Sequence, residues 1–308
     1  MTREELKKLI RGTPATIPTA FDDNMQLDLA RQKDLSQWWV ENGLGTDVAA
    51  LKVAAAMGEG AELADEELPK VLRAVVDGAG KDATVICALK SKNTLATIED
   101  AKMAQDMGAI GLQIELPFHH KPVQDDFVRY YTDISDAIDI GIMIYNTFWF
   151  GCQSLTADTI LRLSDAEHVV AIKWAVPEGH DYDEMTRFSD TFNVIDNSGQ
   201  CVRCYKNGGR GYISATIPAY PKFDLDLFQM LEAKRYDEAQ TLYSRAIGAL
   251  AEWMRKTQAH SGGMRQFKAM MTVVGQPAGP PRPPTLPIEN EELAELKGLF
   301  GELNWPVA

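Results

Sequence analysis

The sequence of 308 residues predicts an α/β protein of the (β/α)₈ (TIM) barrel class with a C-terminal helical extension. Eight short apolar or β-branched runs alternate with amphipathic segments over about 200 residues, and about 250 residues are typical of this barrel. An open, doubly wound sheet needs fewer units and usually begins with a glycine-rich turn. No G-x-G-x-x-G follows the first run, which favours the barrel.

Each predicted strand is a short run that suits a sheet covered on both faces. The runs span residues 14–20, 47–54, 84–89, 110–116, 140–146, 169–175, 192–196 and 211–216. The segments between them have apolar residues at three-to-four spacing, as in 27–43, 66–80 and 94–109, which predicts helices. The barrel would carry its active site at the carboxyl ends of the strands.

The remainder of the chain is predicted to be helical, so we divide the protein into a catalytic barrel (1–222) and a helical extension packed on it (223–308). Helical patterns cover residues 223–256, 262–275 and 289–303. The proline-rich stretch 276–287 lacks backbone donors and cannot be helical. We interpret it as a rigid connector rather than a recognition motif.

The composition excludes several classes of function. With 44 acidic and 31 basic residues the net charge is −13, which disfavours nucleic-acid and anionic-membrane partners. The C-x-x-C pair Cys201 and Cys204 has no second Cys or His pair nearby, and the five histidines lack zinc-ligand spacing. We therefore expect no metal and no cofactor. Neither a signal-peptide core nor a membrane-length apolar run occurs, which predicts a cytoplasmic protein with reduced thiols.

The candidate catalytic residue is Lys173, which interrupts the buried run VVAIKWA. Burial disfavours the ammonium form, and a neutral lysine amine can attack a carbonyl to form an imine. Tyr145 ends the preceding strand, so it would face the same pocket and could carry protons. The structural alternative is a lysine that reaches the barrel rim or pairs with a carboxylate, the role we expect for Lys52 and Lys90.

These pieces resemble the dihydrodipicolinate synthase/N-acetylneuraminate lyase family of class I aldolases, from about residue 11 to the C-terminus. The resemblance lies in IYN (144–146), IKWA (172–175) and GGRGYISAT (208–216), together with the tail 267–287. It implies that Lys173 forms an imine with a 2-oxo acid and that Tyr145 shuttles protons. It also implies that the turn after the second strand holds the carboxylate, that the Ile213 carbonyl faces the imine, and that the protein is a homo-oligomer, a dimer or a tetramer.

Three departures from the family pattern bear on substrate choice. The family's G-T-T-G-E turn reads AAMGE (55–59), so its backbone N–H groups remain but both threonines are lost. His119 stands where the family has a relay tyrosine, and it or His120 could replace that relay, although both could simply face solvent. Phe150 replaces an arginine of the lysine-biosynthetic enzymes. The candidate substrate-binding residues are Ala56, Met57, Gly58, Asn146, Phe150 and Ile213.

The sequence leaves several functions open. The first is reversible aldol cleavage that gives pyruvate and an aldehyde, and the aromatic run 148–150 favours a bulky or apolar aldehyde, unless these rings pack on a neighbouring subunit. The second is removal of water from a 2-keto-3-deoxy sugar acid. The third is a descendant that binds a small acid without turning it over. A phosphate site at NGGRG (207–211) is a fourth, although these glycines also fit the family's ordinary turn.

Overall fold

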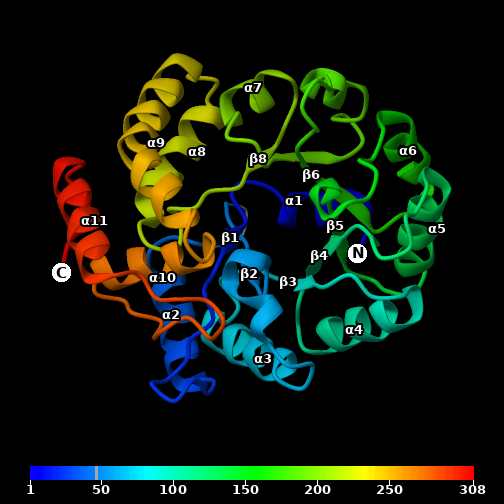
Figure 1. Ribbon diagram of the computed structural model, residues 1–308. Coiled ribbons are helices and arrows are strands. Elements are labelled where there is room, and N and C mark those ends of the chain that lie inside the picture. Colours follow the sequence, from blue (N-terminus) through cyan, green and yellow to red (C-terminus); the bar gives the residue numbers. More distant parts are fainter. Residues whose placement is uncertain (46–47) are drawn as a thin grey trace. The chain divides into compact units, whose positions relative to one another are not determined.

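The protein is a (β/α)₈ barrel, as predicted, in a computed structural model that describes residues 1–45 and 48–308 (Figure 1). The strands follow one another in the order β1 to β8 in a single sheet. Asp47, the first residue of one predicted strand, lies outside the described residues. The strands are β1 (Ala15–Thr16), β2 (Leu51–Val53), β3 (Val85–Leu89), β4 (Gly111–Glu115), β5 (Gly141–Tyr145), β6 (Val169–Trp174), β7 (Asn193–Asp196) and β8 (Gly211–Tyr212).

Helices occupy the connections and the C-terminal extension. They are α1 (Arg3–Leu9), α2 (Leu29–Glu41), α3 (Leu68–Ala79), α4 (Thr94–Asp106), α5 (Gln124–Ser135), α6 (Ala157–Arg162), α7 (Cys201–Lys206), α8 (Pro221–Glu232), α9 (Tyr236–Gln258), α10 (Met264–Val273) and α11 (Asn290–Glu302). The helical pattern at 223–256 is divided between α8 and α9, because Lys234 adopts a left-handed conformation with φ of 58°. The proline-rich connector before α11 is not helical, as expected.

The chain forms two compact units. The first unit comprises Met1–Pro14, Gly45–Lys52 and Ala83–Ile213, and the second comprises Ala15–Leu44, Val53–Asp82 and Ser214–Ala308. The division that the sequence suggested at residue 222 separates barrel from extension and stays a prediction.

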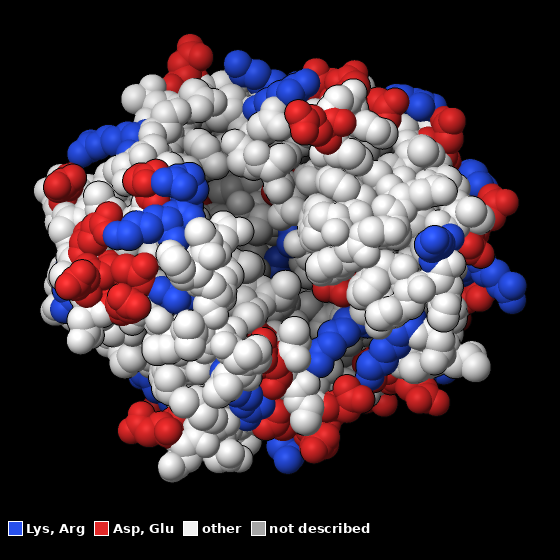
Figure 2. Space-filling view, in the orientation of Figure 1, with Lys and Arg blue, Asp and Glu red and all other residues white. Residues whose placement is uncertain are grey.

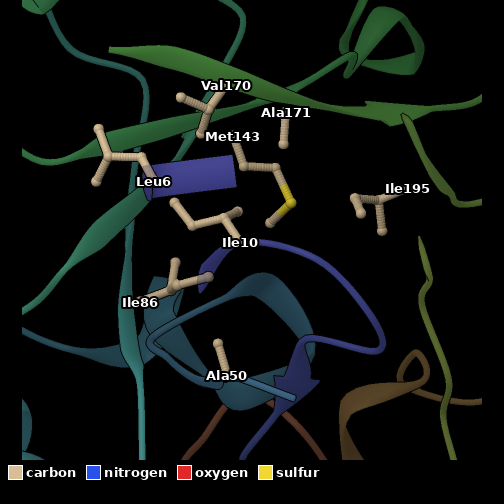
Figure 3. Close-up of a cluster of buried hydrophobic side chains, with 8 residues drawn as sticks. All are labelled: Leu6, Ile10, Ala50, Ile86, Met143, Val170, Ala171 and Ile195. Carbon is tan, nitrogen blue, oxygen red and sulfur yellow. The ribbon is translucent and has the colours of Figure 1, made fainter. Parts of the chain in front are cut away.

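An apolar cluster fills the interior of the first unit (Figure 3). Two of its members, Leu6 and Ile10, come from α1 and the residue that follows it. The Thr2 side chain and Glu5 form a capping box that begins this helix. Five of the other members project from the strands, namely Ile86, Met143, Val170, Ala171 and Ile195, and Ala50 directly precedes β2. The amino-terminal helix therefore packs on the strand side chains of the interior and occupies one end of it.

The last strand of the first unit closes against the segment that precedes β1. Gly211 forms a parallel bridge with Gly12, and the Tyr212 N–H donates to the Gly12 carbonyl oxygen at 3.0 Å. A Cβ atom on Gly211 would lie 2.0 Å from that oxygen. Gly211 is thus required where two backbones approach closely.

Candidate active site

Three neighbouring strands bring an acid, a phenol and an amine to one level of the sheet. Glu115 pairs in register with Tyr145, and Tyr145 pairs with Lys173. Side chains alternate between the two faces of a strand. Met143 and Ala171 belong to the interior cluster, so Tyr145 and Lys173, two residues further on, face the same interior. The register therefore builds a row Glu115–Tyr145–Lys173 directly above the apolar core.

Lys173 has the environment that imine chemistry requires. Its side chain is buried, with 5% of the residue exposed, and its Nζ lies 3.4 Å from the centroid of the Tyr145 ring. Burial and then the charge of Lys52 hold the pKa of Lys173 well below its usual value, while Glu115 opposes them. Trp174 faces the other side of the strand, where its indole donates to the Tyr182 carbonyl oxygen at 3.0 Å. The interior, not Trp174, therefore surrounds the amine.

Tyr145 is held as a neutral phenol. Burial and then the charge of Glu115 raise its pKa to about 12, and a hydrogen bond with the Asn197 side chain opposes both effects. A phenol in this state donates a hydrogen bond at neutral pH and does not act as a resident base. Tyr145 can therefore protonate or orient an oxygen that develops next to Lys173.

Glu115 was not among the residues singled out from the sequence. Burial raises its pKa, and hydrogen bonding from the Ser91 N–H together with the charge of Lys173 lowers it. A buried carboxyl group with a raised pKa, beside a phenol and an amine, is a candidate proton donor or acceptor. A signal was present in GLQIEL (111–116), where Gln113 and Glu115 alternate with apolar residues. This alternation marks a strand face that is not purely apolar.

Lys52 is the second residue that the sequence interpretation misjudged. It lies two residues after Ala50 of the interior cluster, so it faces the same interior and not the rim. The residue is completely buried, and burial lowers its pKa to about 7. Among the described residues none accepts a hydrogen bond from its Nζ. Lys52 therefore differs from a lysine that snorkels or forms an ion pair.

Asn146 and Ile213 border the row of site residues. The Asn146 side chain is buried, donates to the Ala175 carbonyl and the Ser154 hydroxyl, both at 2.9 Å, and accepts from the Leu155 N–H at 3.0 Å. These bonds occupy its amide, so its local role is to fix the loop after β5. The Ile213 N–H donates to the Asp196 carbonyl at 2.8 Å, and its side chain packs against the interior cluster.

Aromatic rings connect the predicted relay residue to Tyr145. His119 is exposed and its ring centroid lies 4.2 Å from that of Phe118, which is 5.1 Å from Phe150. Trp149 continues the series, 6.3 Å from Phe150 and 5.4 Å from Tyr145. Three rings thus lie between His119 and Tyr145 along this series of contacts. The catalytic role of His119 stays a prediction.

The loop after β5 exposes unusually large apolar side chains. Trp149 is 44% and Phe150 is 45% exposed. Figure 2 shows an area without charged side chains over this part of the first unit, whereas lysine, arginine and acidic residues are interspersed elsewhere on the face drawn. A cavity of about 850 Å³ lies nearby and is lined by Phe118, His119 and His120 among others. The apolar surface suits a hydrophobic ligand or partner.

The predicted carboxylate-binding turn belongs to the second unit. Ala56–Gly58 form a 3₁₀ turn, and the Gly58 N–H donates to the Ala55 carbonyl at 2.8 Å. The first N–H groups of such a turn have no partner within it. Those of Ala56 and Met57 are therefore the donors that the turn offers, and their role in binding stays a prediction.

Comparison with known proteins decides the family. A profile of the Dihydrodipicolinate synthetase family matches residues 9–302. The chain belongs to the dihydrodipicolinate synthetase family. A 4-hydroxy-tetrahydrodipicolinate synthase of Clostridium novyi (strain NT) is 27% identical over 298 residues, which cover 96% of this chain and 97% of the relative. The family resemblance inferred from the motifs is thus confirmed, and the chain is an enzyme, a lyase.

Solved structures show the same fold. A monomeric dihydrodipicolinate synthase variant superposes with a TM-score of 0.85 at 24% identity, covering 96% of this chain and 98% of the other. YagE, a prophage protein of the same family from E. coli K12 in complex with pyruvate, has a TM-score of 0.83 at 22% identity, with 96% and 99% covered. At these identities the likeness concerns the fold alone.

Among the described helices, none has both the length and the apolar character needed to cross a membrane. The described residues also contain no group of three His, Cys, Asp or Glu side chains that could hold a metal ion.

Proposed function

We propose that this lyase forms an imine between Lys173 and a 2-oxo acid, and that it reversibly cleaves a 4-hydroxy-2-oxo acid to pyruvate and an aldehyde. The observation that supports this most is the row of Glu115, Tyr145 and Lys173, in which the buried amine lies against the phenol ring. The complex of YagE with pyruvate supports the choice of a 2-oxo acid.

The first steps convert the amine to an electron sink. Neutral Lys173 Nζ attacks the C2 carbonyl carbon, and the oxygen takes a proton to give a carbinolamine. Loss of that oxygen as water leaves a protonated imine. The low pKa of Lys173 serves this step, because a larger fraction of the amine is neutral at physiological pH.

Cleavage then follows from the electron sink. A base removes the proton from the C4 hydroxyl, the C3–C4 bond breaks, and its electron pair moves into the imine to give an enamine and the aldehyde. A proton added at C3 and attack of water on the imine release pyruvate and restore Lys173. In this proposal Tyr145 orients the reacting oxygen and carries its proton, and Glu115, which pairs in register with Tyr145 and has a raised pKa, exchanges that proton.

The aldehyde that we propose is bulky or apolar. Trp149 lies against Tyr145, and Phe148 and Phe150 contact Trp149. Phe150 stands where the resemblance implies an arginine in the lysine-biosynthetic enzymes. A phenyl ring cannot pair with a carboxylate. We therefore propose that the protein is not the lysine-biosynthetic synthase, although its relatives carry that name.

The remaining features of the proposal follow the family resemblance. The N–H groups of the 56–58 turn assist in binding the carboxylate, Ile213 offers its carbonyl to the imine, and His119 assists proton transfer. The enzyme acts without a cofactor as a cytoplasmic homo-oligomer, a dimer or a tetramer. Because one similar structure is a monomeric variant, the oligomeric state of this chain is to be measured directly.

Borohydride trapping tests the proposal. The intact protein is incubated with pyruvate, reduced, and analysed by intact mass and peptide mapping beside a Lys173→Arg variant. We expect one adduct on Lys173 and none in the variant. Absence of an adduct with pyruvate and with longer 2-oxo acids would refute imine formation. The remaining alternative would then be a protein that binds a small acid without turning it over.

A product assay separates the two catalytic alternatives. Release of pyruvate and an aldehyde from a 4-hydroxy-2-oxo acid supports aldol cleavage. Conversion of a 2-keto-3-deoxy sugar acid with loss of water, and without pyruvate, supports the hydro-lyase. Comparing an aromatic aldehyde with an aldehyde that bears a carboxylate, in the condensation direction, tests the assignment made from Phe150.

A further inference from the structure

Neither the core packing nor the proposed chemistry explains Lys52. Its side chain points into the interior of the first unit, one layer above the apolar cluster that contains Ala50. It is completely buried, and its Nζ has no hydrogen-bond partner among the described residues. A buried amine without a hydrogen-bond partner is stable only if it is neutral or if an anion binds to it.

The Glu115 carboxylate, which faces the same interior, is not the anionic partner of Lys52. Glu115 acts on Lys173, and its level in the sheet is that of Tyr145. Lys52 also acts on Lys173, as a repelling charge that stabilises the neutral amine. Lys52 therefore lies close enough to Lys173 to influence its charge, and Lys52 and Glu115 act on Lys173 in opposite directions.

A 2-oxo acid bound at Lys173 brings an anion to this place. In the imine the carboxylate carbon is bonded directly to the carbon that Nζ has attacked, so the carboxylate lies within a few ångströms of Lys173. A lysine that is a neighbour of Lys173, and that has no partner of its own, meets the carboxylate there. We propose that Lys52 is the residue that binds the carboxylate of the 2-oxo acid.

This assignment, which rests on the proposed function, connects two properties of the site. Without ligand, burial and then the charge of Lys52 lower the pKa of Lys173, which is kept ready as the neutral nucleophile. With the carboxylate bound, Lys52 takes up a proton and forms a charge-assisted hydrogen bond, which in proteins is about twice as strong as a neutral one. The site would then select acids over neutral ketones by means of one side chain.

The experiment compares pyruvate with acetone, which has the same reacting carbon and no carboxylate. Rates of borohydride trapping are measured against concentration for the wild type, Lys52→Met and Lys52→Gln, with thermal melting as the control for folding. We expect the half-saturating pyruvate concentration to rise by about 10- to 100-fold in both variants. The trapping of acetone should change by less than about threefold at a pH where Lys173 is neutral.

Two results would overturn the assignment. An unchanged concentration dependence for pyruvate would mean that Lys52 does not meet the carboxylate. An equal loss for pyruvate and acetone would mean that Lys52 acts only through Lys173. Since either variant removes the charge, failure of one to fold leaves the other as the test.

The failure of imine formation is distinguishable from the failure of this assignment. If the wild type forms no adduct, pyruvate binding is measured by titration calorimetry on the wild type and Lys52→Met. Loss of binding in the variant would uphold Lys52 as the carboxylate ligand in a protein that binds the acid without an imine. Equal binding, or none in either protein, would refute it.

Discussion

Two lysines, one in each unit, are buried almost equally, but only one of them has polar partners for its ammonium group. Lys52 in the first unit is 0% exposed and Lys268 on α10 in the second unit is 3% exposed. The Nζ of Lys268 lies 2.9 Å from a carboxylate oxygen of Glu59, donates to the Pro280 carbonyl oxygen at 2.7 Å and lies 4.4 Å from the centroid of the Phe21 ring. Lys52 has none of these kinds of contact among the described residues.

The difference teaches that burial alone does not identify a reactive lysine. Burial is the largest cause that lowers the pKa of each, but for Lys268 the charge of Glu59 and its hydrogen bond oppose the change. Glu59, whose φ is 65°, is itself fixed in the left-handed region by the turn that it ends. A buried lysine whose ammonium group is paired and hydrogen-bonded stabilises the fold, whereas a buried lysine without such partners is available to bind a ligand.

Removing the bonded lysine should have the largest effect on stability. Lys268→Met leaves the Glu59 carboxylate buried without its partner, so we expect a loss of about 3–5 kcal/mol in the free energy of unfolding. Urea denaturation at neutral pH measures it. The double variant Glu59→Gln/Lys268→Met should recover much of that loss. A loss below about 1 kcal/mol for the single variant would mean that the pair is not a structural one.

Removing the unpartnered lysine should stabilise the protein in a pH-dependent way. The native pKa of Lys52 is about 7, below the value of 10.5 of the unfolded chain, so the unfolded state binds more protons between these values. Wild-type stability should therefore rise with pH across this window. Lys52→Met lacks this contribution, and it should be the more stable protein by several kcal/mol at pH 7 and by progressively less towards pH 10.

Unfolding of both proteins in urea at several pH values measures this difference. A difference between them that does not vary from pH 7 to 10 would show that Lys52 has an ordinary pKa in the native state. Lys90→Met, at a partly exposed position of the same unit, provides the matched control for the loss of one lysine side chain.

Altering the acid of the row should give the smallest effect. The Glu115 carboxylate favours the ammonium form of Lys173, so Glu115→Gln should lower the pKa of Lys173 further. The acid limb of the pH profile for pyruvate trapping should then move to lower pH, with a rate change of about tenfold or less on that limb. A shift to higher pH would contradict the arrangement of charges described for the row.

The sequence was sufficient for the fold and for the two residues at consecutive strand ends. Continuous apolar runs predicted all eight strands, and Lys173 and Tyr145 lie in register as their positions suggested. The inward direction of Lys52 was not predictable, because the run AALKVAA is apolar on both sides and alternation cannot assign a face to its lysine. Glu115 was missed although its alternation with apolar neighbours was visible.

Other features depend on contacts between distant residues. The partner of Lys268 is Glu59, more than two hundred positions away in the chain. The chain of rings from His119 to Tyr145 depends on how two loops fold over each other. Neither arrangement leaves a periodic pattern in the sequence, so pattern analysis could not find them.

The helix at the amino terminus has a kinetic consequence. Leu6 and Ile10 lie in the apolar cluster at one end of the interior of the first unit (Figure 3), and Lys173 follows Ala171 of that cluster by two residues along β6. A ligand must then arrive and depart by the carboxyl ends of the strands. In the proposed cleavage, in which the 2-oxo acid stays covalently attached, the aldehyde would depart first and pyruvate last. Inhibition by the two products would accordingly differ in type, with pyruvate competing directly with the substrate for the free enzyme.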